Sequence, residues 1–169
     1  MSPVSPDLVV CRATAEDLPR IENLMQFYNY DLSEWVPVEF AANGLYAIRP
    51  KQAYWSKASV VPYKLLVGGH WAGFAVLDDE VIDPASQHNM GYFFVARRYR
   101  GLGVGLHAAR AIFRAHPGRW EVYHLERNQA ARQFWSKALV QLADATPSVC
   151  SRVIDGLPST LYGFSIGES

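Results

Sequence analysis

The sequence has little of what marks several common protein classes. Its 169 residues include only two cysteines, Cys11 and Cys150, which are too few for a disulfide framework and are not spaced as zinc ligands. No apolar run approaches the ~20 residues of a transmembrane helix, and the start, MSPVSPDLVV, lacks the basic and apolar blocks of a signal peptide. No HExxH, CxxC or Gly-Lys-Ser/Thr motif occurs. We therefore expect a cytoplasmic protein with no membrane partner and no metal site.

Net charge is also absent overall, but the charges are unevenly distributed. Sixteen Lys and Arg residues balance sixteen Asp and Glu residues. Nine basic and two acidic residues fall within 97–137, which gives that segment a net charge of +7 and leaves −7 for the rest. A basic segment in an otherwise acidic chain favours a local anionic ligand over nucleic acid. Charge alone fits a solvated helix face equally well.

What the sequence does have is enough apolar surface for a core. Half of its residues are hydrophobic and 13% are aromatic, which predicts one folded domain over residues 1–169. Helical spacing predicts helices over 15–30, from 104 to 115 and from 128 onward. Short apolar runs predict the strands, and a polar loop is expected at 78–83. The predicted strands cover 8–13, 63–67, 71–77, 90–95 and 120–126, with two more around Asp155-Gly156.

Three alternating glycines stand where the helix from 104 begins. The stretch RRYRGLGVGLHAARAIF (97–113) places Gly101, Gly103 and Gly105 between a predicted buried strand and this helix. Strand, turn, helix and strand form a βαβ unit, so strands 90–95 and 120–126 are expected to be parallel neighbours in a mixed sheet. The first amides of a helix lack internal partners and carry the positive end of its dipole. Glycines there let the backbone close around a phosphate group.

The spacing of the glycines separates several nucleotide-binding folds. A Rossmann fingerprint starting at Gly101 requires its third glycine at 106, where the sequence has Leu106. Only one βαβ unit is evident, and it lies in the middle of the chain. A nucleotide-binding module of another kind remains as a weaker hypothesis.

Two motifs resemble those of the GNAT superfamily of acetyl-CoA-dependent N-acetyltransferases. Arg100-Gly101-Leu102-Gly103-Val104-Gly105 resembles the pyrophosphate motif R/Q-x-x-G-x-G/A, and Asn128-x-x-Ala131-x-x-Phe134-Trp135 resembles the second motif, N-x-x-A-x-x-F-Y. The order of predicted elements matches over essentially the whole chain. The resemblance implies a three-layer α/β fold, of mixed α+β type, around a mostly antiparallel sheet of about seven strands. In that fold one parallel pair splays apart to hold acetyl-CoA.

The resemblance also implies residue roles for the cofactor. Phe94 and Val95 would contact the pantetheine arm through their backbones. The amides of Arg100, Gly101, Leu102, Gly103, Val104 and Gly105 would bind the pyrophosphate. Asn128 would bind or position the cofactor at the splay, and Phe134 would line the pantetheine channel, although Phe134 fits core packing equally well. The ribose phosphate would meet Arg98, Arg110 or Arg132.

Both positions where the family usually carries its acid and base are altered. The strand carboxylate is replaced by Tyr92, a poor base with an ordinary pKa of ~10, and the motif tyrosine is replaced by Trp135. We take Tyr92 and His124 as candidate catalytic residues, since an ordinary histidine pKa suits a base near neutrality. Further candidates for taking the proton are Glu126, next to His124 on the same predicted strand, and the loop residues Asp78 and Asp79. His124 also fits an ordinary sheet histidine, Tyr92 a packing residue, and Asp78 and Asp79 a solvated loop.

These features favour an enzyme that moves an acetyl group from acetyl-CoA to a primary amine of a small molecule or peptide by direct attack. The altered acid and base positions leave a non-catalytic, regulatory acyl-CoA-binding domain as the alternative. Residues 31–63 are expected to lie over the acceptor cleft. No nucleic-acid partner is expected, and a homodimer stays open.

Overall fold

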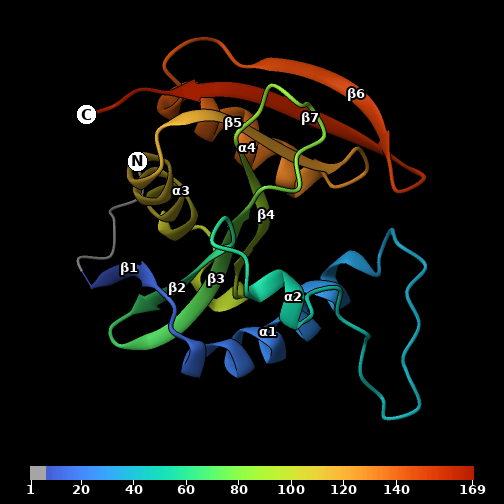
Figure 1. Ribbon diagram of the computed structural model, residues 1–169. Coiled ribbons are helices and arrows are strands. Elements are labelled where there is room, and N and C mark those ends of the chain that lie inside the picture. Colours follow the sequence, from blue (N-terminus) through green and yellow to red (C-terminus); the bar gives the residue numbers. More distant parts are fainter. Residues whose placement is uncertain (1–6) are drawn as a thin grey trace.

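The computed structural model describes residues 7–169 and shows one seven-stranded sheet with helices on both faces (Figure 1). The strand order is β1-β2-β3-β4-β5-β7-β6, and every neighbouring pair is antiparallel except β4 and β5. The predicted mixed, mostly antiparallel sheet of seven strands is thus confirmed. The strands are β1 (Leu8–Arg12), β2 (Val61–Val67), β3 (His70–Asp78), β4 (His88–Val95), β5 (Gly118–Leu125), β6 (Ser148–Ile154) and β7 (Leu157–Ile166).

The helices begin and end at recognisable signals. Thr14 N–H donates to the Asp17 carboxylate at 2.8 Å, as the sequence predicts for the start of the first helix. Asn128 Oδ1 accepts from Ala131 N–H at 3.0 Å and caps the last helix. The helices are α1 (Leu18–Leu32), α2 (Gln52–Trp55), α3 (Val104–Ala115) and α4 (Gln129–Leu142), with short 3-10 turns at Ala15–Asp17 and Arg97–Tyr99.

Hydrophobic clusters on both faces of the sheet produce the three layers. Ile21 and Met25 of α1 pack on Phe74 and Phe94. On the opposite face α3 and α4 cover the centre of the sheet with Ile112, Phe113, Trp135, Ala138 and Leu139. Figure 1 shows α1 and α2 on one side of the strands and α3 on the other.

The parallel pair that α3 connects is joined over only a short distance. His88 pairs with Trp120 and Asn89 with Glu121, and the ladder between β4 and β5 ends there. β4 also bulges at Gly91, because Val76 faces Tyr92 while Leu77 faces Met90. Beyond Asn89, therefore, one edge of β4 and one edge of β5 are free of each other, which is the splay that the sequence predicts.

Among the described residues, no helix has the length and apolar character that crossing a bilayer requires. Residues 7–169 also hold no group of three His, Cys, Asp or Glu side chains placed to bind a metal ion.

Candidate active site

The glycine turn leaves an open backbone at the start of α3. Gly101 and Gly103 have φ angles of 76° and 82°, in the left-handed region that favours glycine. A Cβ added at Gly101 would meet nothing within 4 Å, and one at Gly103 only the edge of His107 at 3.9 Å. Packing against the protein therefore does not explain these two glycines. Free amides at the helix start and open space above them fit a phosphate group.

The amide of Arg100 does not belong to this set. Arg100 N–H donates to the Arg97 carbonyl at 3.2 Å, so this amide already has a backbone partner, and its contact with the pyrophosphate stays a prediction. Leu102 is 46% exposed, and Val104 is buried as the first residue of α3. The free donors at this turn are thus the backbone amides of residues 101–106.

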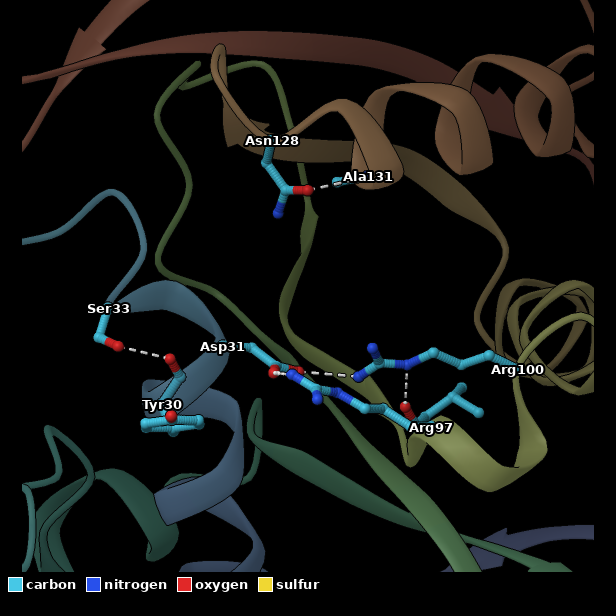
Figure 2. A network of polar contacts seen from close by, with 8 residues as sticks. Tyr30, Asp31, Ser33, Arg97, Arg100, Asn128 and Ala131 are labelled. Carbon is cyan, nitrogen blue, oxygen red and sulfur yellow. Dashed lines mark hydrogen bonds and ion pairs between the residues drawn. The ribbon is translucent and has the colours of Figure 1, made fainter.

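The side chain of Arg100 is held beside the turn by two partners. Its Nε donates to the Val95 carbonyl at 2.7 Å, and its guanidinium pairs with Asp31 at 2.8 Å. Arg97 reaches the other oxygen of Asp31 at 3.0 Å. Figure 2 shows both arginines pointing from the turn toward Asp31 on α1. Two guanidinium groups are therefore gathered at one carboxylate, on side chains that start beside the glycine turn.

Val95 and Phe94 are turned in opposite directions along β4. Ala96 N–H donates to the Ala72 carbonyl at 2.8 Å. Bonding direction alternates along an antiparallel pair, so Phe94, paired with Phe74, also turns its N–H and C=O toward β3. This geometry does not favour the backbone contact of Phe94 with a pantetheine arm, which stays a prediction. Val95 faces the splay, where its carbonyl already accepts from Arg100 and its N–H remains.

Gly105 differs from the other two glycines because its neighbour explains it. A Cβ at Gly105 would lie 3.0 Å from Phe134 Cε2 and 3.6 Å from Phe93 Cε1. The rings of Phe93 and Phe134 stack with their centroids 5.5 Å apart. Gly105 thus lets α3 approach α4, and Phe134 is part of that packing at the edge of the splay.

A cleft of about 570 Å³ opens where β4 and β5 diverge. Its walls come from α1, from the segment 36–50, from both strands, from the start of α4 and from the β6–β7 turn. Asn128 lies at its rim, where the capping oxygen is already used and the amide nitrogen is not (Figure 2). The cleft joins the diverging strands to the acceptor side that the sequence predicts for residues 31–63. Its lining includes Tyr28, Glu39, Arg49, Tyr92, Phe93, Tyr123, His124, Asn128, Trp135 and Asp155.

Tyr92 lies on the α1 face of β4 among other tyrosines. Its ring is 5.4 Å from that of Tyr28 and 6.5 Å from that of Tyr54. Burial raises the pKa of Tyr92 to about 12. The hydroxyl therefore keeps its proton near neutral pH and can donate a hydrogen bond, but it cannot act as a base.

His124 lines the same cleft on β5, but its ring nitrogens are both engaged. Nδ1 lies 2.8 Å from the Leu125 carbonyl, which accepts, so Nδ1 carries the proton. Nε2 accepts from the Tyr162 hydroxyl at 3.0 Å. Burial lowers the pKa of His124. Neither nitrogen is free for a substrate proton, so the geometry favours a structural role for His124 over the predicted catalytic one.

Trp135 is part of the core. It is 5% exposed and its ring lies 5.1 Å from Phe93 and 4.8 Å from Phe134. It supports the stacked pair at the splay.

The polar residue that sequence reasoning misplaced is Asp78. It ends β3 and is 2% exposed, although the sequence predicts a solvated loop there. Its carboxylate accepts from Tyr54 Oη at 2.6 Å, Asn89 Nδ2 at 2.9 Å and Glu80 N–H at 3.1 Å. The signal that could have found it is the apolar run through Leu77, which places the next residue at the buried end of a central strand.

No protein-family model matches the chain, and a comparison with curated protein sequences gives no match either. Solved structures do match. A GNAT family acetyltransferase from Elizabethkingia anophelis, with acetyl-CoA bound, superposes with a TM-score of 0.59 at 11% identity, covering 95% of this chain and 99% of that one. A GNAT family acetyltransferase from Streptococcus pneumoniae gives 0.58 at 14% identity, with 95% and 99% covered.

A third match is RimL, a ribosomal-protein alpha-N-acetyltransferase in complex with coenzyme A. It gives a TM-score of 0.63 at 15% identity and covers 97% of each chain. All three coverages extend over nearly the whole length of both chains, so the likeness includes the whole fold and not only one part of it. By its architecture, this chain has the GNAT acetyltransferase fold.

Proposed function

We propose that residues 1–169 form one acetyltransferase domain that uses acetyl-CoA and acetylates a primary amine of a small molecule or peptide. The observation that carries this proposal is the combination of two features at one place: parallel strands that part after Asn89, and an open glycine turn at the start of α3. GNAT structures with the same fold are described with acetyl-CoA or coenzyme A bound.

The residues of this chain fit the cofactor in three parts. The amides of residues 101–106 would hold the pyrophosphate, as hydrogen-bond donors at the positive end of the α3 dipole. The guanidinium groups of Arg97 and Arg100 add charge-assisted donors. The N–H of Val95 faces the splay and would bind the pantetheine arm, beside the stacked rings of Phe93 and Phe134. When bound there, acetyl-CoA would supply the acetyl group as a thioester.

The chain would act on the acceptor mainly by positioning. Holding two reactants in a productive geometry lowers a barrier by up to ~7–11 kcal/mol. The Tyr92 hydroxyl, protonated because its pKa is raised to about 12, would donate a hydrogen bond to an oxygen or sulfur in the cleft.

One observation favours the alternative of a non-catalytic acyl-CoA-binding domain. Tyr92 occupies the place of the usual carboxylate, and Trp135 packs in the core. The two functions share the cofactor site and differ only in turnover. We place the protein in the cytoplasm, with no nucleic-acid partner, which fits two free cysteines.

Coenzyme A binding tests the site. Coenzyme A at 100 times its dissociation constant is expected to stabilise the protein by ~2.7 kcal/mol in thermal or urea unfolding. Gly101→Ala places a methyl group in the open turn and is expected to weaken coenzyme A at least tenfold, about 1.4 kcal/mol. Gly69→Ala is the matched control, because Gly69 has a φ of 79° and also no neighbour within 4 Å of an added Cβ. Equal coenzyme A affinity in both variants would contradict the assignment of the turn.

Turnover separates the two functions. Thiol release from acetyl-CoA is measured over a panel of small amines and peptides with free amino groups. Acceptor-dependent release supports the enzyme. Tight coenzyme A binding with no release over the whole panel supports the binding domain instead.

A further inference from the structure

A second pocket, of about 310 Å³, opens off the cleft on the α1 side of the sheet. The two share Arg49, Pro50, Gly91, Tyr92 and Tyr123 in their linings. The second pocket is formed where the ends of β3 and β4 meet α2, and Asp78 and Asn89 lie in its wall. We call it the Asp78 pocket.

Asp78 is a buried carboxylate with no cation beside it. It is 2% exposed, and within residues 7–169 no Lys, Arg or His nitrogen forms an ion pair with it at 4.0 Å or less. Two basic residues in the pocket lining, Arg49 and Lys51, are exposed, and Arg49 is paired with Asp155 at 3.2 Å. Buried charges in proteins are ordinarily paired. The three hydrogen bonds that Asp78 accepts engage its carboxylate oxygens, but none of them comes from a positively charged group.

Asn89 adds an acceptor that has no donor. Its Nδ2 donates to the Asp78 carboxylate at 2.9 Å. Since a carboxylate only accepts, this bond fixes which end of the amide faces Asp78. Oδ1 therefore points the other way. It is fully buried and without a partner, in a residue that is 2% exposed. A buried, unpaired amide oxygen costs ~1–3 kcal/mol, a cost that a hydrogen-bond donor from a ligand would remove.

Aromatic rings make up much of the remaining wall. The rings of Tyr54 and Tyr92 are nearly perpendicular, with centroids 6.5 Å apart. Tyr123 of β5 lines the same pocket. Burial raises the pKa of each of these three tyrosines, so none of their hydroxyls contributes a negative charge near neutral pH. Neutral tyrosine rings attract cations through their faces.

The backbone also allows the carboxylate to come close to β4. A Cβ at Gly91 would overlap Asp78 Oδ2. Gly91 is the extra residue of the β4 bulge, so the bulge and the missing side chain together let Asp78 approach the strand from which Tyr92 projects. The negative charge is thereby placed next to the cleft.

We propose that the Asp78 pocket binds a protonated amino group, with the Asp78 carboxylate and Asn89 Oδ1 as its acceptors. This inference rests on the proposed acetyl transfer and names the acceptor class. A nitrogen beside a buried carboxylate keeps its proton, because a nearby opposite charge favours the charged form, and a protonated nitrogen has no lone pair for attack. The nitrogen in this pocket is therefore the one that is not acetylated. The acceptor is an aliphatic diamine, whose second nitrogen reaches the cleft beside Tyr92.

The remaining acidic side chains around the two pockets agree with a cationic acceptor. Glu39 and Asp155 line the cleft, and Glu80 lines the Asp78 pocket. Together with Asp78 they outnumber Arg49 and Lys51 as the charged groups of the acceptor side.

The test compares three probes of equal chain length on the wild-type protein saturated with coenzyme A: 1,4-diaminobutane, n-butylamine and 4-amino-1-butanol. Calorimetric titration is expected to show the diamine binding at least tenfold more tightly than the other two. In ¹⁵N-labelled protein, the side-chain amide resonances of Asn89 are expected to shift with each of the three probes, since each carries a protonated amino group, and not with 1,4-butanediol, which carries none. Equal binding of the three probes, or unmoved Asn89 resonances, would overturn the proposal even if no variant is made.

Asp78→Asn removes the charge while keeping the size of the side chain. It is expected to remove the preference for the diamine and to leave coenzyme A affinity unchanged. Asp79→Asn is the matched control, because Asp79 is exposed, pairs with Lys57 at 3.4 Å and does not line the pocket. In turnover, Asp78→Asn is expected to raise KM for 1,4-diaminobutane more than it lowers kcat. Diamine binding without any thiol release would contradict the proposed enzyme while leaving the pocket assignment intact.

Discussion

Asp31 pairs with two arginines of the proposed pyrophosphate site. Its replacement should therefore change both the free energy of unfolding and the affinity for coenzyme A, in directions that follow from these ion pairs. Asp31→Asn removes the carboxylate that pairs with Arg97 at 3.0 Å and Arg100 at 2.8 Å. In the protein without ligand both ion pairs are lost. With ligand, an anion that competes for the same two guanidinium groups is removed.

The magnitudes follow from exposure. The side chain of Asp31 is 30% exposed, and those of Arg97 and Arg100 are 74% and 45% exposed. Ion pairs of this kind contribute ~0.2–1 kcal/mol each, so the free energy of unfolding should fall by about 1 kcal/mol. Arg100 keeps its hydrogen bond to the Val95 carbonyl at 2.7 Å, so its position does not depend on Asp31 alone. Coenzyme A affinity should therefore rise, about three- to tenfold, since 1.4 kcal/mol is a factor of ten.

Calorimetric titration of coenzyme A at low and high salt measures the effect. The gain should shrink as salt increases, because exposed charges are screened over ~10 Å at 0.1 M salt. Asp79→Asn supplies the same change of charge at a distant exposed ion pair and should leave affinity unchanged. Weaker binding in Asp31→Asn would refute the reasoning, since it would mean that the carboxylate orients the arginines for the ligand.

Three further changes test other parts of the site. Gly105→Ala should lower the free energy of unfolding by about 1 kcal/mol, as overpacking against Phe134 exceeds the gain in helix propensity, and in a Phe134→Leu background urea unfolding should show the opposite sign. Tyr92→Phe should keep coenzyme A affinity and slow turnover about 10²-fold, whereas unchanged steady-state turnover would leave Tyr92 a packing residue. Burial lowers the pKa values of His116 and His124 below the ordinary 6.5, so the unfolded chain binds more protons at mildly acidic pH. Urea unfolding should accordingly show stability that is constant above pH 7.5 and falls from pH 7 to 5, with a smaller fall in His124→Gln.

The sequence was sufficient for the features that depend on local order. Helical spacing, the Asn128 cap and the glycine turn all lie within short stretches of chain, and each is where the pattern predicts it. The mixed sheet followed from the single βαβ unit, because its crossover requires β4 and β5 to be parallel.

Features that depend on distant partners were not accessible in the same way. The burial of Asp78 needs Tyr54 and Asn89, which come from α2 and β4. The glycine pattern predicts a phosphate contact for Gly105, but the neighbour of Gly105 is Phe134 on another helix. A hydrophobic or polar pattern indicates whether a residue lies near the end of a helix or strand. It does not indicate which side chain from a distant part of the chain contacts that residue.

The short ladder between β4 and β5 divides the sheet into two antiparallel ribbons, β1–β4 and β5–β7–β6, that meet at one corner. A ligand lying between them would take the place of the hydrogen bonds that β4 and β5 do not form with each other beyond Asn89. Amide hydrogen exchange should therefore be fast at Val95 in the free protein and slow once coenzyme A is bound, while the amides inside each ribbon exchange slowly throughout. Coenzyme A binding would then make the protein more rigid where β4 and β5 diverge, without any change in the strand order.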